Sequence, residues 1–482
     1  MRWAVLLTAA FLVAACSGTG TAPSAASSEG QGEGQGQAAP PSVSTASPAS
    51  TVNAAGTASA TGANWPEYNG NAARTGVADG VPPAGALTKA WTAHLDGAVY
   101  GQPLVVGDEV IAATENDSVY ALSRATGKVI WGKHLGTPVA QPPQHGCGNI
   151  YPLGITGTPV YDAGNGLVYA VAEVAGYHHM LVALSAATGT VALHRYLDTP
   201  TSANQPAFNQ QRPALAIDDG RVYATFGGLA GDCGPYQGSI VSAPLTGNGP
   251  LTSWRTPTTR EGAIWAPGGP VIGPDGNLWV SIGNGAATSG AYDGSDSVTE
   301  LSPALHRLAY FAPSTWAADN ARDLDLGSTQ PVLAAGNTVF IVGKRGVGYL
   351  LDGTHLGGIG GQLAQQRICG AFGAAAVSGS VVYEPCRDGS GMTAVQVGAA
   401  AKTIKVLWRG PGSAQGTPVV GGGAVWVTDY NGGILYELRQ STGRVMHQIS
   451  VAGGLPHFSS LALSGGSAYV STLRGITAIN GA

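Results

Sequence analysis

Short apolar segments alternate with polar turn residues along most of the chain. Residues 101–135 show the pattern most clearly, with segments at Pro103–Val106, Val110–Ala113 and Ser118–Leu122 and a fourth that runs through Trp131. Each segment has the length of a β-strand, and Gly-Asp, Asn-Asp and Ala-Thr-Gly sequences separate them. The pattern therefore predicts a four-stranded antiparallel meander.

The same pattern recurs down the chain at intervals of about 42 to 60 residues. Similar units begin near Thr158, Arg212, Gly269, Thr329, Ala374, Thr417 and Ser459. A period of this length is typical of β-propellers, in which each blade is a four-stranded meander. We therefore predict an all-β fold over residues 64–482, an eight-bladed β-propeller of four-stranded antiparallel blades.

The last unit contains only three apolar segments, Ser459–Leu463, Ala468–Thr472 and Ile476–Asn480. A fourth segment of the same kind, Leu87–His94, precedes the first complete unit. We expect the N-terminal and C-terminal strands to pair in one blade, because this closes the ring and leaves no exposed sheet edge.

Composition agrees with a turn-rich β-protein and excludes some functions. The 482 residues include 74 glycines, and only 11% of residues are charged. The formal net charge is -5, which supplies no basic surface for nucleic acid. We expect no nucleic-acid partner, and we expect a monomer.

Residues 1–16 have the pattern of a signal peptide. Arg2 precedes an apolar run that is too short to span a membrane, and small residues then lead to Cys16. This end resembles a lipobox, which implies cleavage before Cys16 and lipidation of its amino terminus. We expect an exported protein, anchored by this lipid to the outer face of the cell membrane or to the periplasmic side of an envelope membrane. An ordinary secretory signal that contains a chance cysteine is the alternative.

Residues 17–63 consist mainly of Gly, Ala, Ser, Pro, Thr and Gln. A segment of this composition buries too little apolar surface to offset the loss of backbone entropy on folding. We predict a disordered tether between the anchor and the propeller.

Unusual residues gather in two positions of the repeat. In a blade, residues just before the first strand and just after the second strand emerge at the same axial end of the ring. Before first strands lie Cys147, Asn149, Tyr151, Glu261, Trp265, Arg322, Asp323, Asp325, Cys369 and His457. After second strands lie Glu115, Asn116, Asp232, Cys233, Asn284, Lys344, Arg345, Cys386, Arg387, Asp429, Tyr430 and Arg474. Each alone would be a solvated rim residue, but together near a central channel they indicate a ligand site.

Besides Cys16 the chain has four cysteines, an even number, which fits an exported protein with two disulfides. The same positions in the repeat predict their pairing. Four cysteines allow three pairings, of which we expect Cys369 with Cys386 across one hairpin and Cys147 with Cys233 between neighbouring blades.

Several of these segments resemble the quinoprotein dehydrogenases, which are eight-bladed propellers that hold pyrroloquinoline quinone (PQQ) and calcium over the channel. The sequence Trp-Pro-Glu-Tyr-Asn-Gly at 65–70, followed by Arg-Thr-Gly at 74–76, is similar to their first segment. The repeated Ala-Thr-Gly turn before a strand that carries a tryptophan is similar to their blade signature. The resemblance covers the whole ring.

The resemblance implies roles for five residues between 262 and 352. Trp265 would form the floor under the quinone, Asn284 would ligate calcium, and Asp323 would be the catalytic base and a second calcium ligand. Lys344 would reach the quinone oxygens, and Asp325 would belong to the cofactor site. Such a site could take a proton from a hydroxyl group while hydride leaves for the quinone.

The sequence departs from this family at three points. No two cysteines are adjacent, no acid occupies 148–151 where a calcium-binding glutamate is expected, and Leu324 replaces an aromatic residue. One hypothesis is a binding or assembly module with a degenerate redox site, similar to the propeller lipoprotein that assists outer-membrane protein assembly. Its partner would be an envelope protein or a small molecule. The alternative is a divergent PQQ-dependent dehydrogenase that oxidises alcohols or sugars.

No other chemistry is indicated by the sequence. His178 and His179 lack the spaced partners of a zinc site. We predict that both lie in a long solvated loop.

Overall fold

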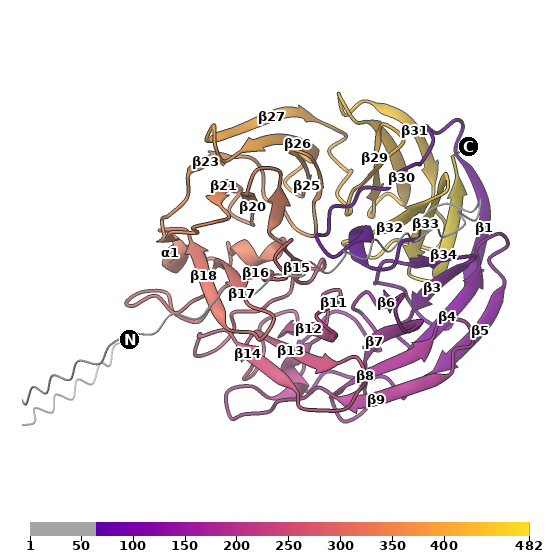
Figure 1. Cartoon of the computed structure of the whole chain (residues 1–482), viewed down its shortest axis with the longest axis horizontal. Coiled ribbons are helices and arrows are strands. Elements are labelled where there is room, and N and C mark those ends of the chain that lie inside the picture. The colour runs from indigo at the N-terminus through magenta and orange to yellow at the C-terminus, as the bar shows by residue number, and fades with distance from the viewer. Residues whose placement is uncertain (1–63, 482) are drawn as a thin grey trace, which may run out of the picture. The chain divides into compact units, whose positions relative to one another are not determined.

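The computed structural model describes residues 64–481. The predicted signal peptide, the predicted lipidation site Cys16 and the predicted tether at 17–63 lie outside the described residues. Residues 64–481 form eight sheets arranged as a ring, with antiparallel pairing throughout except for one short parallel pair (Figure 1). The predicted eight-bladed propeller is confirmed.

In seven blades the four meander strands occur in chain order, whereas the eighth takes its fourth strand from the segment before blade 1. Blade 1 contains β2 (Leu104–Val106), β3 (Glu109–Ala113), β4 (Ser118–Ser123) and β5 (Val129–His134). Blade 2 contains β6 (Val160–Asp162), β7 (Leu167–Val174), β8 (His178–Ser185) and β9 (Val191–Tyr196). Blade 3 contains β11 (Ala216–Asp218), β12 (Arg221–Gly228), β13 (Ser239–Pro244) and β14 (Thr252–Arg255). Blade 4 contains β15 (Val271–Ile272), β16 (Leu278–Ile282), β17 (Ser297–Leu301) and β18 (Arg307–Ala312).

The second half of the ring repeats this order. Blade 5 contains β19 (Val332–Ala334), β20 (Thr338–Val342), β21 (Val347–Asp352) and β23 (Ala364–Arg367). Blade 6 contains β24 (Ala376–Ser378), β25 (Val381–Cys386), β26 (Gly391–Gly398) and β27 (Thr403–Arg409). Blade 7 contains β28 (Val419–Gly421), β29 (Ala424–Asp429), β30 (Ile434–Arg439) and β31 (Val445–Ser450). Blade 8 contains β32 (Leu461–Ser464), β33 (Ser467–Thr472), β34 (Gly475–Asn480) and β1 (Thr88–His94).

The ring closes as predicted. Strand β1 pairs with β34 in antiparallel register from Thr88 opposite Asn480 to His94 opposite Gly475. Blades 3 and 4 each take one further short strand, β10 (Asn209–Gln210) and β22 (Gly358–Ile359). Helical structure within residues 64–481 is limited to α1 (Trp316–Asn320) and three short 3-10 turns, η1 (Tyr68–Gly70), η2 (Pro206–Phe208) and η3 (Leu326–Ser328).

The apolar core lies between neighbouring blades. Inner strands are buried on both faces, whereas outer strands such as β9 alternate between partly and fully exposed residues. One cluster joins Leu104 of blade 1 to Val168 of blade 2, and another joins Trp426 of blade 7 to Tyr469 of blade 8. The blades therefore stabilise one another through packing.

In three blades, an Ala-Thr-Gly or Ser-Thr-Gly turn contacts a tryptophan on the outer strand of the preceding blade. The Trp131 indole of β5 donates a 2.7 Å hydrogen bond to the carbonyl of Ala186, in the turn of the next blade. Gly189 of that turn has φ +68 and lies against the indole, so a Cβ there would be 2.5 Å from a ring carbon. Trp91 with Gly127 and Trp408 with Gly443 repeat this contact. The blade signature is thus a connection between adjacent blades.

We expect Gly189→Ala to lower the free energy of unfolding by about 2 kcal/mol or more, because it combines an unfavourable φ with overlap on Trp131. Gly220→Ala is the matched control, since Gly220 also has positive φ (+67) but open space around its Cβ position. Its cost should be about 1 kcal/mol. Urea unfolding of both variants measures the difference, and equal losses would contradict a role for the indole contact.

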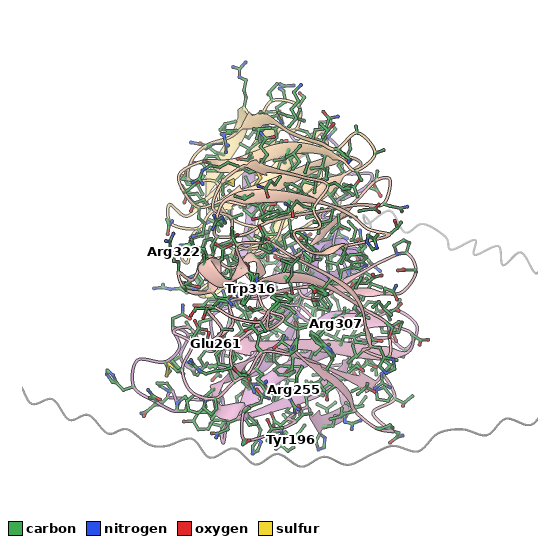
Figure 2. The ribbon with its side chains drawn as sticks, turned by 90° about the vertical axis from the view of Figure 1, so that its left-hand side faces the viewer. Tyr196, Arg255, Glu261, Arg307, Trp316 and Arg322 are labelled. Carbon is green, nitrogen blue, oxygen red and sulfur yellow. A yellow bond between two sulfur atoms is a disulfide. The ribbon has the colours of Figure 1, made fainter. Side chains whose placement is uncertain are left out.

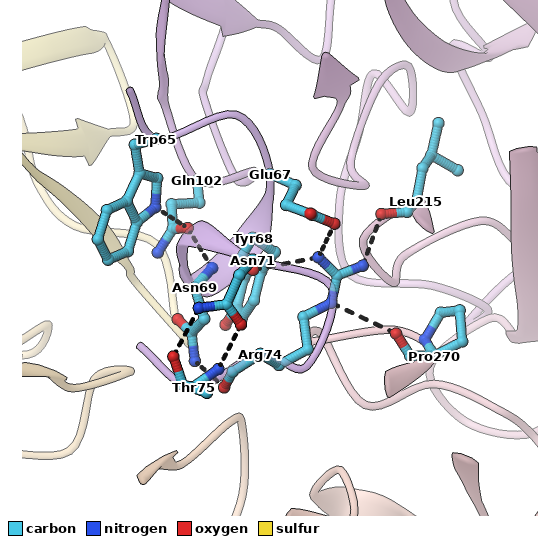
Figure 3. Close-up of polar contacts among 10 residues, drawn as sticks. All are labelled: Trp65, Glu67, Tyr68, Asn69, Asn71, Arg74, Thr75, Gln102, Leu215 and Pro270. Atoms are coloured by element: carbon cyan, nitrogen blue, oxygen red, sulfur yellow. Dashed lines mark hydrogen bonds and ion pairs between the residues drawn. The ribbon is translucent and has the colours of Figure 1, made fainter. Parts of the chain in front are cut away.

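The segment that precedes β1 lies across the ring and is bonded to the innermost strands of five blades. Trp65 pairs with Val105, and the backbone N–H groups of Tyr161, Ile272, Val377 and Val420 donate to carbonyls between residues 66 and 76. Figure 3 shows the polar contacts of this segment, and Figure 1 shows it in indigo at the centre of the ring. Residues 65–76 therefore cover the central channel.

The prediction for His178 and His179 was wrong. Both residues begin strand β8, and the His179 side chain is only 3% exposed. Glu173 lies opposite His179 across the β7–β8 pair, and Asp198 follows β9. Strand pairing, which the local sequence did not indicate, therefore buries His179 between two acids.

Candidate functional site

A cavity of about 360 Å³ lies at the end of the ring where first strands begin. Its volume falls within the range of pockets that bind small molecules. Eight of the polar-end residues that the repeat predicted line it, namely Asn149, Asp232, Trp265, Asn284, Asp323, Lys344, Arg387 and His457. The cavity therefore brings together Trp265, Asn284, Asp323 and Lys344, four of the predicted site residues.

Asp325, the fifth predicted site residue, lies beside the cavity and holds two of its lining residues. Its buried carboxylate accepts a 3.2 Å hydrogen bond from the Trp265 indole and forms a 2.7 Å ion pair with Lys344. Lys344 also forms an ion pair with Asp323, whose side chain is 63% exposed. One ammonium group is thus shared by two carboxylates.

Burial lowers the pKa of Lys344, but the charge of Asp325 and the hydrogen bonds to Asp323 and Asp325 outweigh it, so the pKa is raised. Burial also raises the pKa of Asp325, although Lys344 acts in the opposite direction. Lys344 therefore remains charged at neutral pH, and its charge is compensated locally.

The loop between blades 4 and 5 fixes Asp323 in place. Helix α1 leads into it, and Asp319 at the helix end pairs with Arg345 beside Lys344. The backbone of Asp323 has φ +53, a conformation that is uncommon for residues other than glycine. In the edge-on view of Figure 2, Arg322 of this loop and Glu261 lie toward the same face of the ring. This loop thus contributes Asp323 to the cavity wall.

The donor atoms near Asn284 do not fit calcium. The Asn284 amide nitrogen lies 3.5 Å from Glu261, and Glu261 forms a 2.5 Å ion pair with Arg260. Asp323 and Asp325 are engaged by Lys344. Among residues 64–481, no group of three His, Cys, Asp or Glu side chains is placed to hold a metal ion. Calcium needs six to eight oxygen ligands, usually with several carboxylates, and the residues around Asn284 do not supply them.

Arg212, Phe372 and Phe458 are among the lining residues that sequence analysis missed. Each precedes the first strand of its blade, so the rule that selected the polar residues could have found them. The two phenyl rings are nearly parallel, with centroids 6.5 Å apart, and each lies about 6 Å from the Trp265 ring. Phe458 has φ +62, a rare conformation for a bulky residue. Aromatic surface therefore forms part of the cavity wall.

Three cations surround these rings. Arg212 lies 4.7 Å from the Phe458 centroid, Arg387 lies 4.7 Å from that of Phe372, and the Lys344 nitrogen lies 5.3 Å from that of Trp265. Burial and the charges of Arg212 and Arg387 lower the pKa of His457 to about 4, so this imidazole is neutral at pH 7. The arrangement suits a flat, negatively charged ligand.

Both disulfides form as predicted. Cys147 pairs with Cys233 between blades 2 and 3, and Cys369 pairs with Cys386 within blade 6. Cys233 follows Asp232 of the cavity wall, and Cys386 precedes Arg387. Each bond therefore fixes a loop that contributes to the cavity.

Within residues 64–481, no helix is long and apolar enough to cross a membrane. No curated protein matches the sequence. A protein-family model described as "Outer membrane protein assembly factor BamB" matches residues 86–284.

Solved structures share the fold at low sequence identity. The quinohemoprotein alcohol dehydrogenase ADHIIG of Pseudomonas putida HK5 aligns with TM-score 0.65 and 14% identity over 86% of this chain and 79% of its own. A europium-containing methanol dehydrogenase gives TM-score 0.66 and 15% identity over 86% and 97%. BamB from Moraxella catarrhalis gives TM-score 0.54 and 15% identity over 82% and 97%. This chain therefore shares the β-propeller fold of these proteins, with eight blades in a closed ring.

Proposed function

We propose that this chain is an exported, lipid-anchored binding module whose cavity takes a small molecule and whose redox site is degenerate. The proposal of export and anchoring rests on the sequence of residues 1–16. The proposal of binding rests on the cavity of about 360 Å³, with its aromatic wall and its cations. An envelope protein as a further partner is compatible with the family match at 86–284.

The observation that carries this proposal is the position of Lys344 between Asp323 and Asp325. A divalent cation at Asn284 and Asp323 would have to compete with an ammonium group already bound to these carboxylates. An acidic side chain that is paired with a cation is also a weaker general base, because the pairing favours its charged form. The residues thus serve binding better than calcium-assisted oxidation.

The second candidate function is a divergent PQQ-dependent dehydrogenase that oxidises alcohols or sugars. It is favoured by the presence of Trp265, Asp323 and Lys344 in one cavity. PQQ would supply hydride acceptance when bound, and the cavity's cations and aromatic rings suit its flat, anionic form. The shortage of oxygen ligands for calcium around Asn284 argues against this function.

One experiment separates the two functions. The full chain is incubated with PQQ in calcium or in EDTA, desalted, examined for quinone absorbance and assayed for dye reduction with alcohols and aldoses. We expect no calcium-dependent retention and no dye reduction. Dye reduction that requires calcium and is abolished by Asp323→Asn and by Trp265→Ala would establish the dehydrogenase and overturn our proposal.

A further inference from the structure

Arg212 carries a charge that the protein does not compensate. Among residues 64–481, no side chain or carbonyl forms a hydrogen bond or ion pair with its guanidinium, and its Nε is buried without an acceptor. Burial lowers its pKa to about 10, so it remains charged at pH 7. A buried donor of this kind without an acceptor is costly, and a bound anion would remove the cost.

The groups around Arg212 do not neutralise it. Burial raises the pKa of Glu115, an acid whose charge acts on Arg212, to about 8, so this carboxyl is mostly protonated at pH 7. His457 is neutral at that pH, since its pKa is about 4. Asp232, on the cavity wall, accepts a hydrogen bond from the Tyr236 hydroxyl and is not among the groups whose charges act on Arg212. Positive charge therefore remains at the Arg212 side of the cavity.

The opposite side of the cavity differs. There Lys344 is held by two carboxylates, so that corner offers a ligand no net positive charge. Phe458 lies directly under Arg212 and is nearly parallel to Phe372. An anionic group that meets Arg212 would thus have apolar aromatic surface beside it for a flat ring.

We infer that the cavity binds a flat aromatic carboxylate without a metal ion, with the carboxylate on Arg212 and the ring against Phe458 and Phe372. This inference rests on the proposed binding function and names its ligand class. A guanidinium can donate two parallel hydrogen bonds to a carboxylate, which explains why an arginine with free donors faces the cavity. The neutral His457 beside it adds a polar group without adding charge.

The test uses 2-naphthoate as the probe and its neutral isostere 2-naphthamide as the comparison, with the full chain in EDTA and by isothermal titration calorimetry. We expect the acid to bind at least about tenfold more tightly than the amide, the effect of one charge-assisted contact. Arg212→Gln should remove this preference, and Arg212→Lys should restore part of it. Arg444→Gln, at an exposed arginine in the β30–β31 turn, should leave it unchanged.

Equal affinity for acid and amide, absence of binding by either, or an unchanged preference in a folded Arg212→Gln variant would each overturn the inference. Near-ultraviolet circular dichroism establishes that the variant is folded. Failure here is separate from failure of the proposed function, because the latter is decided by calcium-dependent dye reduction with PQQ. If 2-naphthamide bound as tightly as 2-naphthoate and no dye reduction occurred, the proposed binding function would still hold. Only the inference of a carboxylate ligand would be overturned.

Discussion

Arg74→Ala is expected to lower the free energy of unfolding by about 3 to 5 kcal/mol, the range for breaking a buried ion pair. The Arg74 side chain is fully buried and pairs with Glu67 at 2.7 Å. It also donates to the carbonyls of Tyr68, Leu215 and Pro270 (Figure 3). The substitution would leave these acceptors without a donor and Glu67 without its cation. Urea unfolding followed by tryptophan fluorescence measures the loss.

A control at a surface arginine and a double variant show whether the loss comes from the buried ion pair. Arg444→Ala, at an exposed arginine, should cost less than about 0.5 kcal/mol. Adding Glu67→Gln to Arg74→Ala should recover part of the loss, because the double variant no longer buries an unpaired carboxylate. If Arg74→Ala lowered the free energy of unfolding no more than Arg444→Ala does, Arg74 would not stabilise the packing of residues 65–76 on the blades.

The fold was predictable because its determinants are local and repeated. Strands of period two, separated by glycine turns, reveal each blade within about 45 residues of sequence. Closure followed from counting strands, since three strands at the end of the chain require a fourth elsewhere. The disulfide pairing followed from positions within the repeat. These features depend on residues that are close in sequence or on the number of strands in each unit.

The contacts of Arg74 and Arg212 were not predictable in this way. Arg74 meets Leu215 and Pro270, which lie 141 and 196 residues further along the chain. No local pattern indicates that one guanidinium reaches two blades as well as its own segment. Arg212 was recognised only as the start of a repeat, because an arginine before a strand resembles any solvated rim residue. What distinguishes it is its burial without an acceptor, which depends on the assembled ring.

The candidate site was predicted in part. The resemblance to quinoproteins selected Trp265, Asn284, Asp323 and Lys344, and the ring brings these four to one cavity. It did not indicate that Lys344 would pair with both aspartates, because the ion pairs depend on the loop after α1. The catalytic and cofactor roles of these residues remain predictions.

His179→Gln is expected to remove a pH dependence of stability that wild-type protein shows between about pH 6.5 and pH 10. The His179 ring lies 2.8 Å from Asp198 and 3.6 Å from Glu173, with Phe226 packed against its edge. Burial lowers the pKa of His179, but the charge of Glu173 and the hydrogen bonds to Asp198 and Glu173 outweigh it. The result is a pKa of about 10.

The sign follows from comparing the folded and unfolded states. In the folded protein the pKa lies above the ordinary value of 6.5, so the charged form is favoured by folding. Its contribution to stability is fully present below about pH 6.5 and is lost as the pH rises through about 10. The shift corresponds to at most about 5 kcal/mol, and we expect about 3 to 5 kcal/mol.

Other buried acids also make the protein less stable in alkali, so the difference between wild type and variant is the quantity to measure. Burial raises the pKa of Asp117 to about 8, and its loss of a proton acts in the same direction as that of His179. Urea unfolding at about pH 6 and about pH 10 gives the difference at each pH. We expect a stability advantage of wild type over His179→Gln at the lower pH that is nearly lost at the higher pH.

His194→Gln, at an exposed histidine of the same blade, should show no such change. An advantage that is equal at both pH values would mean that His179 is uncharged in the folded protein, and its contacts with Glu173 and Asp198 would then be hydrogen bonds between a neutral ring and the acids.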